Sequence, residues 1–127
     1  MDRPKMTVTG IVLDSPDAQE LAGFYRRLLS WATKEDEPGW VMLVAPEGGA
    51  GLSFQTDEHY VRPSWPAQAK EQRMMLHLDI EVEDLEAATT YAVSCGAVVA
   101  EFQPQADVRV CLDPAGHPFC LYLDDED

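Results

Sequence analysis

The sequence has few basic residues and no long apolar run. Nine Lys and Arg residues stand against 23 Asp and Glu residues in a chain of 127, which gives a formal net charge of −14. An acidic surface repels the phosphate backbone of nucleic acids, so nucleic acid is not an expected partner. No apolar run approaches the roughly 20 residues that cross a bilayer, and the N-terminus contains no apolar signal core. We therefore expect neither nucleic-acid nor membrane binding.

Cysteine is also scarce. Cys95, Cys111 and Cys120 are odd in number and irregularly spaced, which is typical of neither a disulfide framework nor a zinc motif. Free thiols are usual in a reducing compartment, so we expect a cytoplasmic protein. With 127 residues, the chain is long enough for one domain, or for two small repeated halves that share a core.

The clearest pattern is a strand that runs directly into a helix. Apolar and polar residues alternate from Leu76 to Glu83, which predicts a strand with one apolar and one ionisable face. His77 and Asp79 belong to the ionisable face. Asp84 follows as the expected helix N-cap, with Glu86 in the first turn. The ionisable face of this strand is therefore the first candidate for a functional site.

The order of strands and helices occurs twice along the chain. In the first half we expect a helix with Ser15 as its N-cap and Pro16 at its first position. The expected strands of that half cover residues 6–13, 31–34, 40–45 and 51–55. The second half repeats the order, with a helix over 84–95 and strands over 73–83, 98–102, 108–112 and 118–123. We therefore expect one α+β domain over residues 1–127, with module 1 over about 6–55, a loop over 56–72, and module 2 over about 73–123.

The two halves also align residue by residue. Gly10 corresponds to His77 and Asp17 to Asp84, each pair being 67 residues apart. Gln55 and Cys120, which are 65 residues apart, are expected at equivalent places in the last strand of each half. Identity between the halves is slight, so the repeat is one of pattern more than of residues.

Three segments carry a resemblance to a known superfamily. They read SPDAQELAGFYRRLLSW, HLDIEVEDLEAA and DPAGHPFCLYL. Together with the repeat, they resemble the vicinal oxygen chelate superfamily, which includes glyoxalase I, bleomycin-resistance proteins and extradiol dioxygenases. With PSWP in the loop, the two later segments resemble the glyoxalase-like subgroup common in actinobacteria. The resemblance implies two βαβββ modules that form a cup-shaped mixed sheet with the helices on its outer face.

The resemblance also implies where a metal ion would bind. In metal-using members, four ligands come from the first and last strands of both modules, and the matching positions here are Gly10, Gln55, His77 and Cys120. His77 fits this pattern, whereas Gly10 has no side chain and Cys120 stands where glutamate is usual. A divalent ion needs three or four ligands of matched chemistry. We therefore expect no cofactor; a divalent metal is allowed but disfavoured.

Six residues are candidates for ligand binding: Gln55, Trp65, His77, Asp79, Cys120 and Tyr122. His77 is also the candidate catalytic residue, because an imidazole exchanges protons near neutral pH. Asp79 could fix the tautomer of that imidazole, or it could be a charged residue at the rim of the cup. Cys120 and Tyr122 share one face of the last strand, where a packed, inert thiol competes with a ligand role. Trp65 either closes the pocket or fills a gap between the modules.

The function that the resemblance implies is the binding of a small organic molecule. We expect a protein of the glyoxalase/bleomycin-resistance type without an intact metal site. The alternatives are a lyase, isomerase or dioxygenase of the same superfamily that uses a degenerate metal site or His77 as general base, and a purely structural or regulatory dimer. A homodimer is expected as well, because it would cover strand aromatics such as Trp31 and Trp40.

Overall fold

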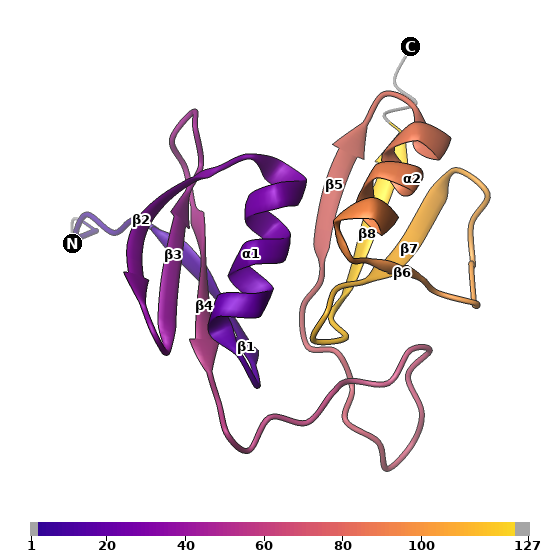
Figure 1. Ribbon diagram of the computed structural model, residues 1–127, viewed down its shortest axis with the longest axis horizontal. Coiled ribbons are helices and arrows are strands. Elements are labelled where there is room, and N and C mark those ends of the chain that lie inside the picture. The colour runs from indigo at the N-terminus through magenta and orange to yellow at the C-terminus, as the bar shows by residue number, and fades with distance from the viewer. Residues whose placement is uncertain (1–2, 124–127) are drawn as a thin grey trace. The chain divides into compact units, whose positions relative to one another are not determined.

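The computed structural model describes residues 3–123, which belong to two compact units, residues 1–58 and 59–127. Each unit contains one helix and one four-stranded mixed sheet (Figure 1). In both units the order of elements is strand, helix, and then three strands. The predicted α+β class and the two βαβββ modules are therefore confirmed.

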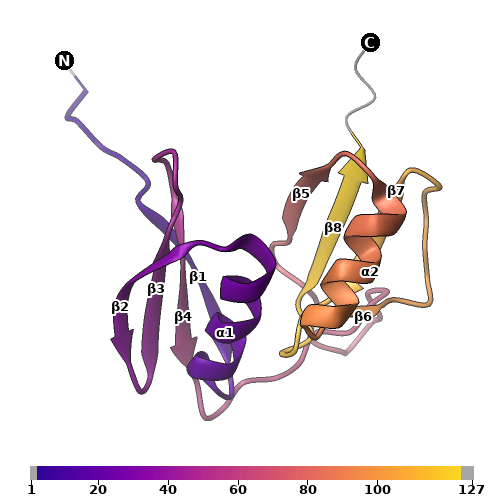
Figure 2. The ribbon, with the colours of Figure 1, turned by 45° about the horizontal axis from the view of Figure 1, so that its top comes forward.

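Module 1 has an aromatic core. Its elements are β1 (Gly10–Ser15), α1 (Ala18–Leu29), β2 (Ala32–Glu37), β3 (Trp40–Val44) and β4 (Gly51–Thr56). The strand order is β1-β4-β3-β2, with β1 and β4 parallel. Helix α1 covers one face of this sheet (Figure 2). Beneath it the rings of Tyr25 and Phe54 stack with centroids 5.5 Å apart, and Phe24 meets Tyr25 edge-on at 4.8 Å. All three side chains are fully buried, so burial and ring packing together stabilise this module.

Module 2 repeats this topology with smaller side chains. Its elements are β5 (Leu78–Val82), α2 (Leu85–Cys95), β6 (Val98–Val99), β7 (Val108–Leu112) and β8 (Pro118–Leu123). The strand order is β5-β8-β7-β6, with β5 and β8 parallel. Phe119 and Leu121 of β8 are buried, and α2 contributes Leu85, Ala92 and Cys95 to the same core. No helix within residues 3–123 is long and apolar enough to cross a bilayer.

The first helix begins two residues later than predicted. Its N-cap is Asp17, whose carboxylate accepts hydrogen bonds from the backbone N–H groups of Gln19 and Glu20. Ser15 is instead the last residue of β1, where its hydroxyl accepts from the N–H of Asp17. The prediction of Ser15 as N-cap was wrong because pairing with β4 keeps Ser15 in the sheet. Asp84 caps α2 as predicted and accepts from the N–H of Ala87.

Two strands of module 2 are shorter than predicted. β5 begins at Leu78 instead of residue 73, so His77 lies immediately before it. The β5–β8 ladder starts at the pair Leu78–Phe119, and the preceding residue of β8 is Pro118, which has no N–H to extend it. β6 ends at Val99 instead of residue 102. The alternation within β5 is nonetheless the predicted one: Asp79 is exposed between two half-buried apolar residues.

The pairing register corrects the alignment of the last strands. In module 1, Val12 pairs with Ser53 and Asp14 with Gln55. In module 2, Asp79 pairs with Cys120 and Glu81 with Tyr122. Since both first strands end two residues before their N-caps, the residues equivalent to Cys120 and Tyr122 are Ser53 and Gln55.

Candidate functional site

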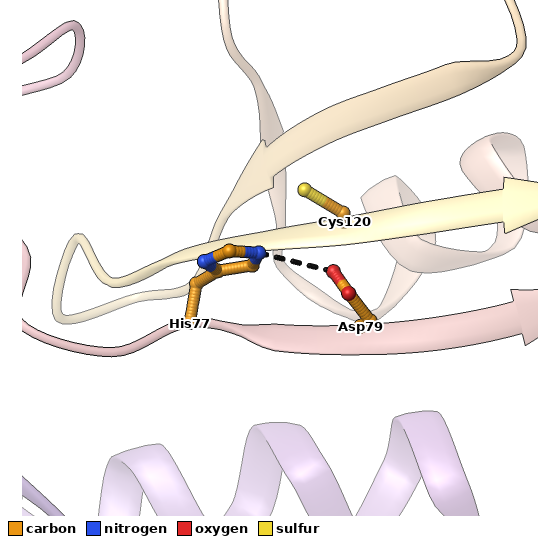
Figure 3. A group of neighbouring side chains, drawn as sticks. All are labelled: His77, Asp79 and Cys120. Carbon is orange, nitrogen blue, oxygen red and sulfur yellow. Dashed lines mark ion pairs between the residues drawn. The ribbon is translucent and has the colours of Figure 1, made fainter.

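Three side chains with different donor atoms converge at the β5–β8 pair (Figure 3). His77 Nε2 lies 3.1 Å from Asp79 Oδ1. The donor atoms of His77, Asp79 and Cys120 all lie within 4.8 Å of one another. An imidazole, a carboxylate and a thiol are thus within reach of one bound molecule.

These side chains line a pocket of about 310 Å³ that lies wholly in module 2. The lining residues are His77, Asp79, Gln105, Asp107, Val108, Cys120, Tyr122 and Leu123. Polar and apolar groups are mixed around it, and the volume lies at the lower end of the range usual for small-molecule pockets, roughly 300–1,000 Å³. The pocket therefore has the size and the chemistry to hold a small organic molecule.

Strand alternation explains why these residues meet. Successive side chains of a strand point to opposite faces, and Phe119 and Leu121 occupy the buried face of β8. Cys120 and Tyr122 therefore point to the other face, where Asp79 of β5 is the register partner of Cys120. The parallel pairing of the first and last strands thus joins segments of module 2 that are far apart in the sequence.

Both thiols of this sheet are kept protonated. The pKa of Cys120 is raised by partial burial, by the charge of Asp79 and by a hydrogen bond to Asp79. Burial raises the pKa of Cys111 to about 11, with a further contribution from Cys120 and an opposing one from Arg109. Since the thiolate is the reactive form, neither thiol is activated as a nucleophile.

Cys111 and Cys120 do not form a redox pair in this structure. Both are free thiols on the neighbouring antiparallel strands β7 and β8. The register pairs Cys111 with Phe119 and Cys120 with Val110. Because neighbouring positions on a strand face opposite sides, the two thiols point to opposite faces of the sheet.

Two of the six candidate residues are not part of this pocket's lining. Gln55 belongs to the unit of residues 1–58, where its amide lies 3.4 Å from Asp14 Oδ1. Trp65 belongs to the same unit as the pocket, but its indole N–H donates to the carbonyl oxygen of Phe102 at 3.3 Å, and the two rings pack 6.0 Å apart. Trp65 therefore holds the loop against the segment after β6.

Sequence reasoning missed two polar residues of the pocket lining, Gln105 and Asp107. They lie between β6 and β7, a segment without hydrophobic periodicity. The side chain of Gln103 anchors this segment: its Oε1 accepts from the N–H of Val110, and its Nε2 donates to the carbonyl oxygens of Val110 and Ala100. Only the position of Asp107, directly before a predicted strand, could have indicated its place at the rim.

A family model of the glyoxalase-like domain matches residues 10–122. The chain is a member of the glyoxalase-like family. Among curated proteins, none matches the sequence significantly.

Solved structures share this fold at low sequence identity. One is a glyoxalase/bleomycin resistance protein/dioxygenase family enzyme from Burkholderia phytofirmans, with 16% identity and a TM-score of 0.70 over 93% of this chain and 98% of that one. Another is the antibiotic-binding protein TnmS3 from Streptomyces, with 15% identity and a TM-score of 0.61 over 98% and 100% of the two chains. A third is lactoylglutathione lyase from Agrobacterium tumefaciens, with 14% identity and a TM-score of 0.61 over 95% and 96%. Both binding proteins and enzymes are thus built on this fold.

The donor set of this glyoxalase-like chain matches only part of the four-ligand pattern of the metal-using proteins it resembles. His77, Asp79 and Cys120 offer one donor atom each within 4.8 Å of one another, and three donors would suffice for a zinc ion with an open position. The four-ligand pattern, however, takes ligands from both modules. In module 1 the equivalent residues are Gly10 and Ser53, which offer no side chain and a hydroxyl, respectively. The repeat therefore supplies no second set of ligands.

Proposed function

We propose that this protein binds a small organic molecule in the pocket of module 2 without the help of a metal ion. The pocket of about 310 Å³ carries the proposal, because its lining combines the His77–Asp79 pair with Cys120, Tyr122 and apolar side chains. Polar groups that are few and fixed orient a ligand, while the apolar side chains contribute buried area. The likeness to an antibiotic-binding protein of the same fold supports this proposal by analogy.

Native mass spectrometry of freshly purified protein tests ligand and metal together. We expect an organic adduct and no stoichiometric divalent ion, because in module 1 Gly10 supplies no side-chain ligand and Ser53, at the place equivalent to Cys120, offers only a hydroxyl. Cys120→Leu should remove the adduct by filling the pocket, whereas Cys120→Ala, which keeps the space open, should retain it. An adduct that persists in Cys120→Leu would contradict the assigned pocket. A tightly held ion that is lost in His77→Ala would contradict the absence of metal.

A second candidate function follows from the His77–Asp79 contact. A carboxylate that accepts the Nε2–H of an imidazole leaves Nδ1 as the proton acceptor, which is the arrangement of a general base. The protein would then be a metal-free lyase or isomerase that removes a proton from carbon. Deuterium incorporation from D₂O into a panel of carbonyl compounds, lost in His77→Ala, would support catalysis. Binding without such exchange would support the binding protein.

We also propose that the protein is a homodimer. Trp31 and Trp40 are half-buried within their own module, and the indole N–H of Trp40 donates to Glu35 Oε1 at 2.6 Å. A second copy would cover the remaining aromatic surface. Sedimentation velocity should report a species of twice the 14.1 kDa chain mass, and a monomer at every concentration would contradict this proposal.

A further inference from the structure

The pocket of module 2 carries negative charge without a basic side chain in its lining. Asp79 and Asp107 contribute carboxylates, and no Lys or Arg of residues 3–123 is among the lining residues. The nearest basic residue in sequence, Arg109, turns its guanidinium to the carbonyl oxygen of Val108 at 3.2 Å. His77, the histidine of the lining, lies against Asp79.

The two carboxylates differ in their surroundings. Asp79 Oδ1 lies 3.1 Å from His77 Nε2, and the Cys120 sulfur is within 4.8 Å of the donor atoms of both residues. The Asp107 carboxylate has no ion-pair partner within residues 3–123, so its charge is available to a ligand. Its backbone is held in place, because the carbonyl oxygen of Asp107 accepts from the N–H of Leu123 at 3.5 Å.

The loop that carries Asp107 is fixed from its other end by Gln103. The three hydrogen bonds of the Gln103 amide, at 2.7–2.9 Å, tie this loop to Val110 of β7 and to Ala100. A carboxylate on an anchored segment is pre-organised, so less conformational entropy is lost when it binds a cation.

The rest of the lining suits the body of an organic cation. Tyr122 presents an aromatic ring, whose face attracts a cation, and Val108 and Leu123 add apolar area. The net charge of −14 raises the local concentration of cations around the whole chain. An anionic ligand would meet two carboxylates in the pocket and a repulsive surface around it.

We propose that the pocket selects a small organic cation, a protonated amine or an amidinium on an apolar body, with Asp107 as its charge partner and Tyr122 as its aromatic contact. This inference rests on the proposed function, because it names the chemical class of the ligand for the same pocket.

Three matched probes of nearly equal size test the inference: benzylamine, benzyl alcohol and benzoate. Each is titrated into ¹⁵N-labelled protein, and amide chemical shifts of Cys120, Asp107 and Leu123 report occupancy of the pocket. We expect the amine to bind about tenfold more tightly than the alcohol and benzoate to cause no shifts. Added salt should weaken binding of the amine and leave that of the alcohol unchanged.

Two variants separate local recognition from the general charge of the chain. Asp107→Asn should weaken the amine about tenfold without affecting the alcohol. Glu101→Gln removes the same charge from the same loop outside the lining and should leave both affinities unchanged. Equal losses in the two variants would overturn the assignment of Asp107.

The remaining outcomes distinguish this inference from the proposed function. If the alcohol binds as tightly as the amine, or benzoate binds better, the cation preference is overturned while the pocket stands. If none of the three probes shifts the pocket amides, both the inference and the assigned pocket are overturned.

Discussion

The two modules share a topology and a pairing register but differ in the side chains that occupy equivalent positions. Module 1 fills its core with three aromatic rings, from Phe24, Tyr25 and Phe54. At the positions equivalent to His77 and Cys120 it has only Gly10 and Ser53.

Module 2 has smaller buried side chains on its helix and a group of ionisable side chains at its sheet. Its helix buries one Leu, one Ala and one Cys, while the open face of its sheet carries an imidazole, two carboxylates, a thiol and a phenol in one pocket. The comparison teaches that two copies of one topology can differ in where they carry aromatic and ionisable side chains, since the topology requires only the alternation of faces.

The largest expected effect is the loss of stability when a core side chain is truncated. Phe54→Ala should lower the free energy of unfolding by about 3–5 kcal/mol, because a fully buried ring that stacks on Tyr25 is removed. Leu121→Ala, at the equivalent place in module 2, should cost about 1 kcal/mol less, since no ring pair is lost. Urea denaturation measures both values. A greater loss in Leu121→Ala would contradict the contrast between the two cores.

The thiol of the pocket should react slowly at neutral pH. Because its pKa is raised, alkylation of Cys120 by iodoacetamide should speed up as the pH rises beyond the usual thiol range, roughly 8.5. Asp79→Asn removes one cause of the raised pKa and should accelerate the reaction several-fold at pH 8. Buried Cys111, with a pKa of about 11, is the internal control and should stay unmodified in both proteins. An unchanged Cys120 rate in Asp79→Asn would show that burial alone sets its pKa.

The stability losses caused by removing the two helix caps should differ less from each other than those caused by truncating the two cores. Asp17→Ala and Asp84→Ala should each cost about 1 kcal/mol of stability. The loss in Asp17→Ala should be the larger one, because its carboxylate accepts from two N–H groups and that of Asp84 from one. Glu86→Ala, in the first turn but not at the cap, is the control in thermal unfolding. A control loss equal to that of Asp84→Ala would mean that charge near the helix end, rather than capping, decides stability.

The smallest stability effect is expected at the site itself. His77→Ala should change the free energy of unfolding by less than about 1 kcal/mol, because the side chain is 39% exposed and lies outside the core. Circular dichroism melting curves measure this change. A loss comparable to that of Leu121→Ala would show that His77 supports the fold of module 2.

Local signals in the sequence predicted much of module 2. The bounds of β7 and β8 and the cap at Asp84 agree with the structure. Each depends on neighbouring residues alone: alternation makes a strand, and a short carboxylate side chain satisfies helix N–H groups. The same alternation grouped His77 with Asp79, and Cys120 with Tyr122, each pair on one face of its own strand.

Long-range pairing decided the rest. The sequence could not show that β5 begins at Leu78, because that start depends on Pro118 in a distant strand. Nor could it show that Ser53 is the residue equivalent to Cys120, since register is a property of two strands together. Asp107 reaches the pocket because the side chain of Gln103 holds an irregular segment against β7. Residue patterns determine which face a side chain occupies, whereas only contacts between distant segments determine which side chains share a site.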